Sequence, residues 1–311
     1  MKIVVLDGYA ANPGDISWED LKALGDVTVY DRTAKNDIVT RLQDADAALL
    51  NKCPITRETL EKLPNLKYIG VLATGYNIVD TAAAKELGVT VTNIPAYSTR
   101  SVAQHVFALI LEIASHVGEH SRACLLGKWS ASRDFCFWDY PLTEIAGKTL
   151  GIIGYGAIGK AVGRIAEAFD MRVLTYSPSK NSKEALHEIY ASSDIISLNC
   201  PLKADNKEMI NKDVLHEMKK GAWLINTARG GLVNDRDIKE ALENGSLGYY
   251  AADVVTVEPI EKDSPLLTAP NVILTPHIAW APYEARVRLM NIAVGNLKSY
   301  IEGNIINCVN V

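Results

Sequence analysis

The segment Gly154-Tyr155-Gly156-Ala157-Ile158-Gly159 decides the fold of this chain. A short apolar run, Thr149–Ile153, precedes it, and residues 157–169 after it have helical spacing. A strand that feeds a glycine turn and opens a helix exposes backbone N–H groups at a helix N-terminus, where the helix dipole attracts a pyrophosphate. The first glycine allows the tight turn, the second lets phosphates approach, and the third lets the helix pack on the strand. The segment therefore predicts a dinucleotide site at Gly154, Gly156, Ala157, Ile158 and Gly159, with an ordinary glycine-rich βα turn as the alternative.

The composition is that of two globular domains. About 150 residues precede the glycine segment, and the 311 residues are 48% hydrophobic, enough for two buried cores. The net charge of −5 gives no reason to expect a nucleic acid or an anionic membrane as partner. The five cysteines include no CxxC pair, so we expect no metal site, no disulfide framework and a cytoplasmic location. Because residues 2–6 read as a strand, we also expect no signal peptide.

The first hundred residues alternate short β-branched runs with stretches of helical spacing. This alternation predicts a parallel, doubly wound sheet. The expected strands are residues 3–6, 27–30, 47–50, 68–72 and 89–92, and the expected helices are residues 18–24, 38–43, 57–63 and 79–87.

A second doubly wound sheet is expected after the middle of the chain. Its predicted strands are residues 149–153, 172–176, 195–198, 222–226, 249–252 and 272–274. A helix over residues 100–126 and an irregular aromatic arm over residues 127–148 precede it, and burial of the arm by a partner subunit is one explanation. A last helix over residues 282–302 leads to a tail that we expect to return to the first domain. The predicted domains are residues 1–99 with 283–311, and residues 100–282.

Three charged or titratable residues each follow a predicted strand of the second sheet. They are Arg229, Glu258 and His277. Ligands of open α/β sheets bind outside the carboxyl ends of the strands, so all three are expected where a bound cofactor would lie. Taken singly, each has an ordinary explanation: a solvated loop cation, a capped turn before Pro259, and one of six histidines.

Together the three residues suit reduction of a carbonyl by hydride. Hydride transfer leaves negative charge on the carbonyl oxygen, and a histidine can supply the proton. A carboxylate beside the histidine favours its charged form and fixes its orientation. An arginine can grip a carboxylate on the neighbouring carbon. A 2-oxo acid presents both groups side by side, so the pattern predicts such a substrate.

Seven stretches extend this pattern over essentially the whole chain. They are residues 71–77 (VLATGYN), 101–105 (SVAQH), 154–159 (GYGAIG), 200–202 (CPL), 226–230 (NTARG), 253–259 (DVVTVEP) and 275–277 (TPH). In these stretches the sequence resembles the D-isomer-specific 2-hydroxyacid dehydrogenases, and within them the glycerate dehydrogenase (hydroxypyruvate reductase) branch.

The resemblance implies a Rossmann domain that binds NAD or NADP, inserted in a flavodoxin-like catalytic domain formed by the two ends of the chain. It implies reduction of hydroxypyruvate or glyoxylate, with His277 as acid/base and with Arg229 and Glu258 completing the catalytic trio. It also implies that backbone amides around residues 73–75 hold the substrate carboxylate. Further site residues that it indicates are Ala73, Thr74 and Gly75 for substrate, and Cys200, Pro201, Thr227 and Asp253 for cofactor, the last two near the nicotinamide.

The aromatic arm gains an interpretation from the same resemblance. Residues 134–139 are similar to the arm of the glycerate/hydroxypyruvate branch, whose members are typically dimers that embrace through this region. In some members a tryptophan of one subunit reaches the substrate pocket of the other, and Trp138 is the candidate here. Packing of Trp138 within the interface is the alternative. We therefore expect a homodimer.

One departure from the usual pattern concerns the choice of cofactor. A site selective for NAD has an acidic residue after its second strand, where it binds the ribose 2′-hydroxyl. Here Ser177 follows that strand, and no charge at this position repels a 2′-phosphate. Ser179 and Lys180 lie just beyond and are candidates to meet one, whereas Pro178 stands where NADP-preferring relatives often have arginine. The sequence leaves NAD or NADP open, and favours dual use or NADP over strict NAD selectivity.

Two other functions stay open at this point. One is another D-2-hydroxyacid dehydrogenase, acting for example on D-lactate or phosphoglycerate; Glu258 argues against formate dehydrogenases, which lack this glutamate. The other is a binding protein of the same fold that senses a dinucleotide, as the related transcriptional corepressors do. Binding of NAD(P)H without turnover of any 2-oxo acid would favour the sensor.

Overall fold

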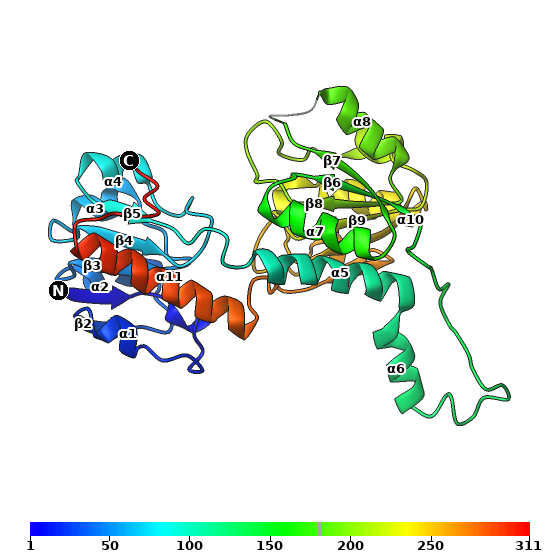
Figure 1. The fold of residues 1–311 in the computed structure, drawn as a ribbon, viewed down its shortest axis with the longest axis horizontal. Helices are drawn as coiled ribbons and strands as arrows, with labels where there is room; N and C mark the ends of the chain where they lie inside the picture. Colours follow the sequence, from blue (N-terminus) through cyan, green and yellow to red (C-terminus); the bar gives the residue numbers. More distant parts are fainter. Residues whose placement is uncertain (179–181) are drawn as a thin grey trace. The chain divides into compact units, whose positions relative to one another are not determined.

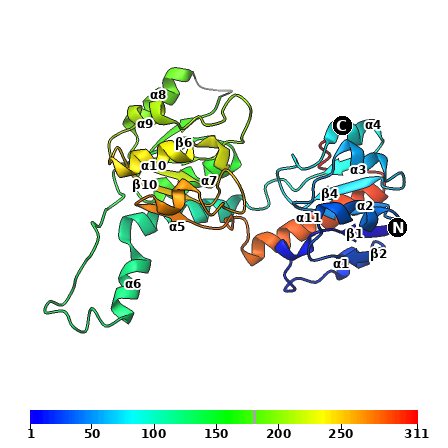
Figure 2. The same cartoon turned by 180° about the vertical axis from the view of Figure 1, so that it is seen from behind.

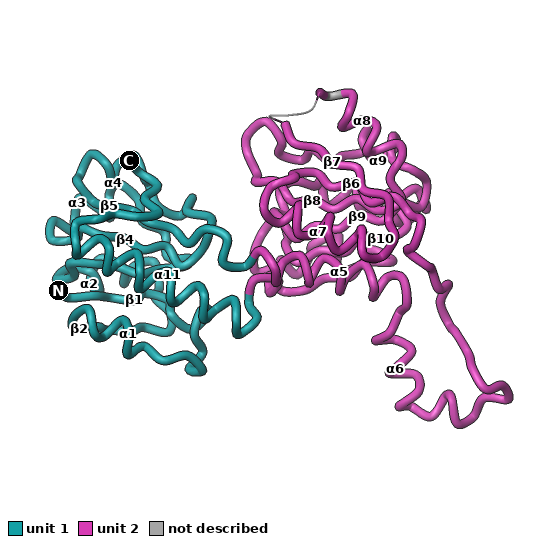
Figure 3. Tube along the Cα trace, viewed as in Figure 1, with its two compact units in different colours: residues 1–98, 281–311 teal, residues 99–280 magenta. Residues whose placement is uncertain are grey.

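The computed structural model describes residues 1–178 and 182–311. Contacts within the chain divide it into two compact units (Figure 3). Unit 1 comprises Met1–Ser98 and Ala281–Val311, and unit 2 comprises Thr99–Trp280. Each unit is an α/β structure with one all-parallel sheet (Figure 1), so the predicted fold class is confirmed.

Unit 1 has a five-stranded sheet in the order β2-β1-β3-β4-β5. This order, with the first strand between the second and third, is that of flavodoxin-like folds. The strands are β1 (Lys2–Val5), β2 (Asp26–Val29), β3 (Ala47–Leu50), β4 (Tyr68–Val71) and β5 (Thr90–Thr92). The helices are η1 (Gly8–Ala10), α1 (Glu19–Lys22), η2 (Lys35–Asp37), α2 (Ile38–Leu42), α3 (Arg57–Glu61), α4 (Thr81–Glu86) and α11 (Tyr283–Ile301).

The C-terminal residues complete unit 1. Every residue of β3 and β4 is buried, as expected for parallel strands covered on both faces. Helix α11 packs against β4, where the ring of Tyr300 lies 4.9 Å from that of Tyr68. The tail then runs beside β5: the N–H of Val309 donates to the carbonyl of Val91 over 2.9 Å. The tail therefore returns to the first domain, as its sequence position predicts.

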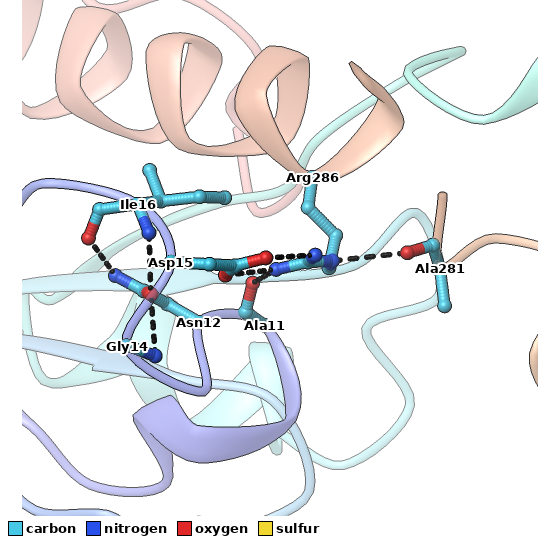
Figure 4. A network of polar contacts seen from close by, with 7 residues as sticks. All are labelled: Ala11, Asn12, Gly14, Asp15, Ile16, Ala281 and Arg286. Atoms are coloured by element: carbon cyan, nitrogen blue, oxygen red, sulfur yellow. Dashed lines mark hydrogen bonds and ion pairs between the residues drawn. The ribbon is translucent and has the colours of Figure 1, made fainter. Parts of the chain in front are cut away.

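Arg286 ties the start of α11 to the loop after β1 (Figure 4). Its guanidinium donates to both carboxylate oxygens of Asp15, over 2.7 and 2.5 Å, and to the carbonyl of Ala11. Its Nε donates to the carbonyl of Ala281, the first residue of the chain's second passage through unit 1. The two hydrogen bonds from the guanidinium to the carboxylate lower the pKa of Asp15, so they favour its ionised form. Arg286 thus anchors two loops at one end of α11.

Unit 2 has a six-stranded sheet in the order β11-β10-β9-β8-β6-β7. The strands are β6 (Thr149–Ile153), β7 (Arg172–Tyr176), β8 (Ile195–Leu198), β9 (Ala222–Asn226), β10 (Leu247–Ala252) and β11 (Val272–Leu274). The helices are α5 (Thr99–Ser115), α6 (Val117–Leu125), α7 (Ala157–Ala168), α8 (Lys183–Ser192), α9 (Lys212–Glu217), η3 (Gly230–Leu232), α10 (Asp235–Glu243) and η4 (Pro265–Thr268). Because β7 and β8 flank β6 on opposite sides, the strand order reverses at the end of β6, which is where ligands bind in such sheets.

Alternate residues of the unit 2 strands feed two cores, one on each face of the sheet. Ile152 lies in the core under α5 and α7, whereas Ile153 lies in the core under α8, α9 and α10. All five residues of β6 are therefore buried, and the glycine segment leaves the sheet from a rigid strand.

The helix predicted over residues 100–126 is two helices, so that prediction is wrong. The chain breaks at His116, whose backbone is left-handed (φ 48°), and α5 and α6 meet at a bend of 58°. The ring of His116 is buried and stacks on Tyr140 at 4.7 Å, and its Nε2 lies 3.3 Å from the Tyr249 hydroxyl. These contacts with residues remote in sequence hold the break.

Helix α6 and residues 127–148 project from the body of unit 2 (Figures 1 and 2). This arm leaves large apolar side chains exposed, namely Leu125, Leu126, Trp129, Phe135, Trp138 and Leu142. An apolar surface of this kind marks an interaction site in many proteins. Among the described helices, none alone is long and apolar enough to cross a membrane; α5 and α6 pass that test only as a bent pair.

Candidate active site

The glycine segment joins β6 to α7 by a turn that only its own glycines permit. Gly154 has φ +99°, and a Cβ there would lie 2.6 Å from the backbone of Asn199 and Cys200. A Cβ on Gly159 would lie 2.3 Å from the carbonyl oxygen of Gly154. Gly156 differs, because a Cβ there would meet no described atom within 4 Å and its φ is an ordinary −81°. The chain itself requires the first and third glycines, and it leaves open space beside the second.

The first turn of α7 is available to an anion. Gly156 is its N-cap residue, and no side chain caps the helix in the described structure. The first N–H groups of an α-helix have no partner within the helix, and together with the helix dipole they attract negative charge. The open space beside Gly156 lies at this turn. The local structure therefore suits the pyrophosphate of a dinucleotide.

Two buried polar atoms, just after the neighbouring strands β8 and β9, have no hydrogen-bond partner among the described residues. Thr227 follows β9 and Asn199 follows β8; the hydroxyl of Thr227 and the amide oxygen of Asn199 are buried without a partner among the described residues. Buried polar atoms are rarely left without hydrogen bonds, and a bound ligand is one explanation for such groups. Both atoms lie at the carboxyl edge of the sheet, as the glycine segment does. These observations fit a dinucleotide along this edge.

Ser177, which is expected to lie near the ribose of the cofactor, directly follows β7. Its hydroxyl accepts a hydrogen bond from the N–H of Tyr155 over 3.2 Å, so it lies beside the glycine segment. Ser179 and Lys180 fall outside the described residues. Cys200 is 7% exposed, and its burial raises the pKa of the thiol to about 11, so this thiol stays neutral near pH 7. Pro201 follows it on the exposed side.

The structure brings two members of the predicted trio into contact. Nδ1 of His277 lies 2.6 Å from Oε2 of Glu258, and both side chains are 31% exposed. The carboxylate can therefore orient the ring through Nδ1. This pairing leaves Nε2 of His277 as the nitrogen that faces away from Glu258. That nitrogen is the one available to exchange a proton with a substrate.

The loop of Arg229 packs against the loop that leads to Glu258. The loop of Arg229 follows β9, and a Cβ on the next residue, Gly230, would lie 1.9 Å from the carbonyl carbon of Val255. The loop that carries Arg229 thus packs directly on the loop that leads to Glu258. The guanidinium is exposed and donates to the carbonyl of Ala228. The guanidinium has further N–H groups beside the one that bonds to Ala228, and these can meet an anion.

Asp253 has partners that the sequence does not predict. It is 1% exposed, and its carboxylate accepts hydrogen bonds from the hydroxyl of Thr275 and the N–H groups of Ile278 and Ala279. Asp253 thus holds the loop that carries His277. Its expected place near a nicotinamide stays a prediction.

The residues expected to hold a substrate carboxylate lie in unit 1. Ala73, Thr74 and Gly75 follow β4, and the Thr74 hydroxyl donates to the carbonyl of Ile94 over 2.8 Å. The backbone N–H groups of the three residues have no acceptor among the described residues. They are therefore available to a carboxylate, and their role stays a prediction.

Comparison with known proteins establishes the family. The profile described as "D-isomer specific 2-hydroxyacid dehydrogenase, NAD binding domain" matches residues 107–279. A hydroxypyruvate reductase of Blautia hydrogenotrophica is 49% identical over an alignment of 321 positions, which covers all of both chains. A glycerate dehydrogenase of Methylorubrum extorquens is 43% identical over 276 residues, 88% of each chain. This chain belongs to the D-isomer-specific 2-hydroxyacid dehydrogenases. It is an oxidoreductase that acts on CH–OH groups with a nicotinamide cofactor.

The solved structures agree with this D-2-hydroxyacid dehydrogenase fold. An acyclic imino acid reductase in complex with NADPH and D-Arg is 32% identical, with a TM-score of 0.87 over 99% of this chain and 100% of that chain. The family profile names NAD, whereas this neighbour holds NADPH. Both cofactors thus occur on this architecture.

The sequence does not single out two residues that lie next to the carboxylate of Asp253. Thr275 and His105 occur only as letters within the matching stretches, yet the structure joins them: Nε2 of His105 lies 2.9 Å from Oγ1 of Thr275. A histidine among the apolar residues of a helix was the available signal for His105. No local signal marked Thr275, because its partners are remote in sequence. Among the described residues, no group of three or more histidine, cysteine or acidic side chains could hold a metal ion.

The glycine segment allows a paired test by substitution. Gly156→Ala is expected to change the free energy of unfolding by less than about 1 kcal/mol, because its Cβ meets nothing in the chain. It is expected to weaken NADH binding about 10-fold or more, because the methyl group occupies the space left for phosphates. Gly154→Ala should lose about 2 kcal/mol or more, since both its φ and its neighbours exclude a Cβ. Thermal unfolding and calorimetric NADH titration measure both effects; unchanged affinity in Gly156→Ala would contradict the assignment.

Proposed function

We propose that this dehydrogenase reduces hydroxypyruvate or glyoxylate to the corresponding 2-hydroxy acid. The hydrogen-bonded pair of His277 and Glu258 is the observation that carries the proposal, together with a glycine segment that leaves open space at Gly156. The relatives named hydroxypyruvate reductase and glycerate dehydrogenase support this choice of substrate.

The proposed mechanism uses the observed geometry. The glycine segment would hold the pyrophosphate of a reduced cofactor and Thr227 would lie near its nicotinamide, which would supply a hydride to the carbonyl carbon of the substrate. His277 holds a proton at Nε2 and gives it to the carbonyl oxygen as negative charge develops there. Glu258 orients the ring through Nδ1, so that Nε2 faces the substrate. Arg229 is the proposed clamp for the substrate carboxylate. From the resemblance, the backbone amides of residues 73–75 are also assigned to the substrate.

For the cofactor we propose dual use of NADH and NADPH, or preference for NADPH. Ser177 supports this, because a serine at this position neither repels a 2′-phosphate nor fixes a 2′-hydroxyl through a charge. Cys200 and Pro201 are assigned to the same site from the resemblance.

For the assembly we propose a homodimer formed through the arm. The exposed apolar side chains of α6 and residues 127–148 support it, since a second copy would bury them. Trp138, which is 65% exposed, is the proposed contribution to the partner's substrate pocket, with packing in the interface as the alternative. We place the protein in the cytoplasm, a compartment that suits its five free cysteines.

Steady-state oxidation of NADH and NADPH with hydroxypyruvate, glyoxylate and pyruvate tests the function. The proposal predicts the highest kcat/KM with hydroxypyruvate or glyoxylate. His277→Ala should lower kcat about 10²- to 10⁴-fold, because the proton donor is lost, while NADH affinity stays unchanged. Highest activity with pyruvate would indicate a D-lactate dehydrogenase instead. Binding of NADH without turnover of any acceptor would indicate the dinucleotide sensor.

Ser177→Asp tests the cofactor assignment. An added carboxylate should repel a 2′-phosphate and bind a 2′-hydroxyl, so the ratio of kcat/KM for NADPH to that for NADH should fall about 10-fold or more. Ser177→Asn is the matched control, because it adds similar volume without charge. An unchanged ratio in Ser177→Asp would refute the placement of the ribose at this residue.

A further inference from the structure

The loop that carries His277 needs support from outside itself. His277 has φ +54°, in the left-handed region that residues other than glycine seldom adopt. The loop follows β11, a strand of three residues at the edge of the sheet with only β10 as neighbour. Within the loop, the N–H of His277 donates to the carbonyl of Thr275 over 2.9 Å. An unusual backbone at a sheet edge persists only where its surroundings determine it.

The carboxylate of Asp253 supplies that support at the two residues that follow His277 in the sequence. The N–H of Ile278 donates to Oδ1 over 2.8 Å, and the N–H of Ala279 donates to Oδ2 over 2.8 Å. Asp253 is 1% exposed and follows β10, so it is fixed by the core of unit 2. Two consecutive amides after His277 are therefore tied to one buried group.

Thr275, two residues before His277, is bound to the same carboxylate of Asp253. Its Oγ1 donates to Oδ1 of Asp253 over 2.6 Å. A hydroxyl has one proton, and this bond uses it. The second partner of that oxygen is Nε2 of His105, at 2.9 Å, so this nitrogen carries a proton and donates it. Nε2 of His105 also lies 3.5 Å from Oδ1 of Asp253.

His105 reaches this point from a different layer of unit 2. It lies in α5, which packs against α7 and against strands β9 and β10. Its side chain is 18% exposed, so it is largely enclosed. A donor on a well-packed helix thus fixes the hydroxyl of Thr275, and through it the carboxylate of Asp253. Both residues in turn flank or hold His277.

We propose that His105 is a positioning residue for His277 and that it acts through Thr275 and Asp253. The proposal rests on the proposed function in one respect, which is that His277 is the acid. His105 touches neither His277 nor Glu258 in the described structure. Its contribution is to hold the loop so that Nε2 of His277 meets the carbonyl oxygen of the substrate. Small errors in the placement of a catalytic group can lower rates by about 100-fold.

Two pairs of variants test the proposal by kinetics. His105→Leu and Thr275→Val remove the donor and the hydroxyl, whereas His105→Gln and Thr275→Ser keep a group that can make the same bond. The first variant of each pair should lower kcat about 10-fold or more, with NADH affinity and KM within about 3-fold of wild type. The second variant of each pair should recover most of kcat. His216→Leu is the control, because His216 is exposed on α9 and, among the described residues, its ring bonds to the carbonyl of Lys212 alone.

Amide hydrogen exchange tests the same proposal without turnover. In His105→Leu and in Thr275→Val, the amides of Ile278 and Ala279 should exchange about 10-fold faster or more, and Thr275→Ser should restore protection. If wild type reduces no 2-oxo acid, the proposed function fails, and the exchange result still decides the role of His105. Wild-type exchange and wild-type kcat in Thr275→Val would overturn the proposal. Because Thr275→Val changes few atoms, the test stands even if His105→Leu does not fold.

Discussion

The parallel alignment of the six strands in unit 2 is the constraint on which the site depends. Parallel strands end at one edge of a sheet, so loops far apart in sequence meet there. The glycine segment leaves β6, Arg229 follows β9, and Glu258 and His277 follow β10 and β11. The glycine segment and the loop of Arg229 start from fully buried strands, which limits their movement. The chemistry of the site is thus set by where strands end.

Within that frame, close backbone contacts and buried polar groups fix the individual side chains. Gly230 lets the loop of Arg229 lie against the backbone at Val255, which no larger residue would allow. The carboxylate of Asp253 holds the loop of His277, because it accepts hydrogen bonds from two backbone amides and one hydroxyl of that loop. Such charge-assisted hydrogen bonds are stronger than neutral ones, and burial strengthens them further. The reactive pair is therefore exposed while the groups that hold it are enclosed.

Much of the fold could be predicted from the sequence because its strands are short apolar runs. Strands β3, β6, β7, β8, β9 and β11 have the bounds that the sequence predicts. The break between α5 and α6 could not be predicted, because His116 is held there by Tyr140 and Tyr249. Helices α8, α9 and α10 were not predicted at all, although helices between parallel strands were to be expected.

The candidate site likewise contains residues that the sequence predicts and residues that it does not. The glycine segment and the trio were accessible because each has a local signal: a strand before it and a residue type suited to the chemistry. The contact of His105 with Thr275 joins positions 170 residues apart, and nothing in either local sequence indicates it. The match of the family profile and of full-length relatives adds the reaction class, which geometry alone leaves open.

We propose that Glu258 and His277 act as one unit in proton delivery. The most direct test is the single-turnover rate of hydride transfer to hydroxypyruvate, measured by stopped flow with NADH in wild type and in Glu258→Gln. Glutamine keeps the shape of the side chain and removes the carboxylate charge beside Nδ1 of His277. We predict a rate about 100-fold lower or more, with NADH affinity unchanged. An unchanged rate of hydride transfer in Glu258→Gln would contradict the account.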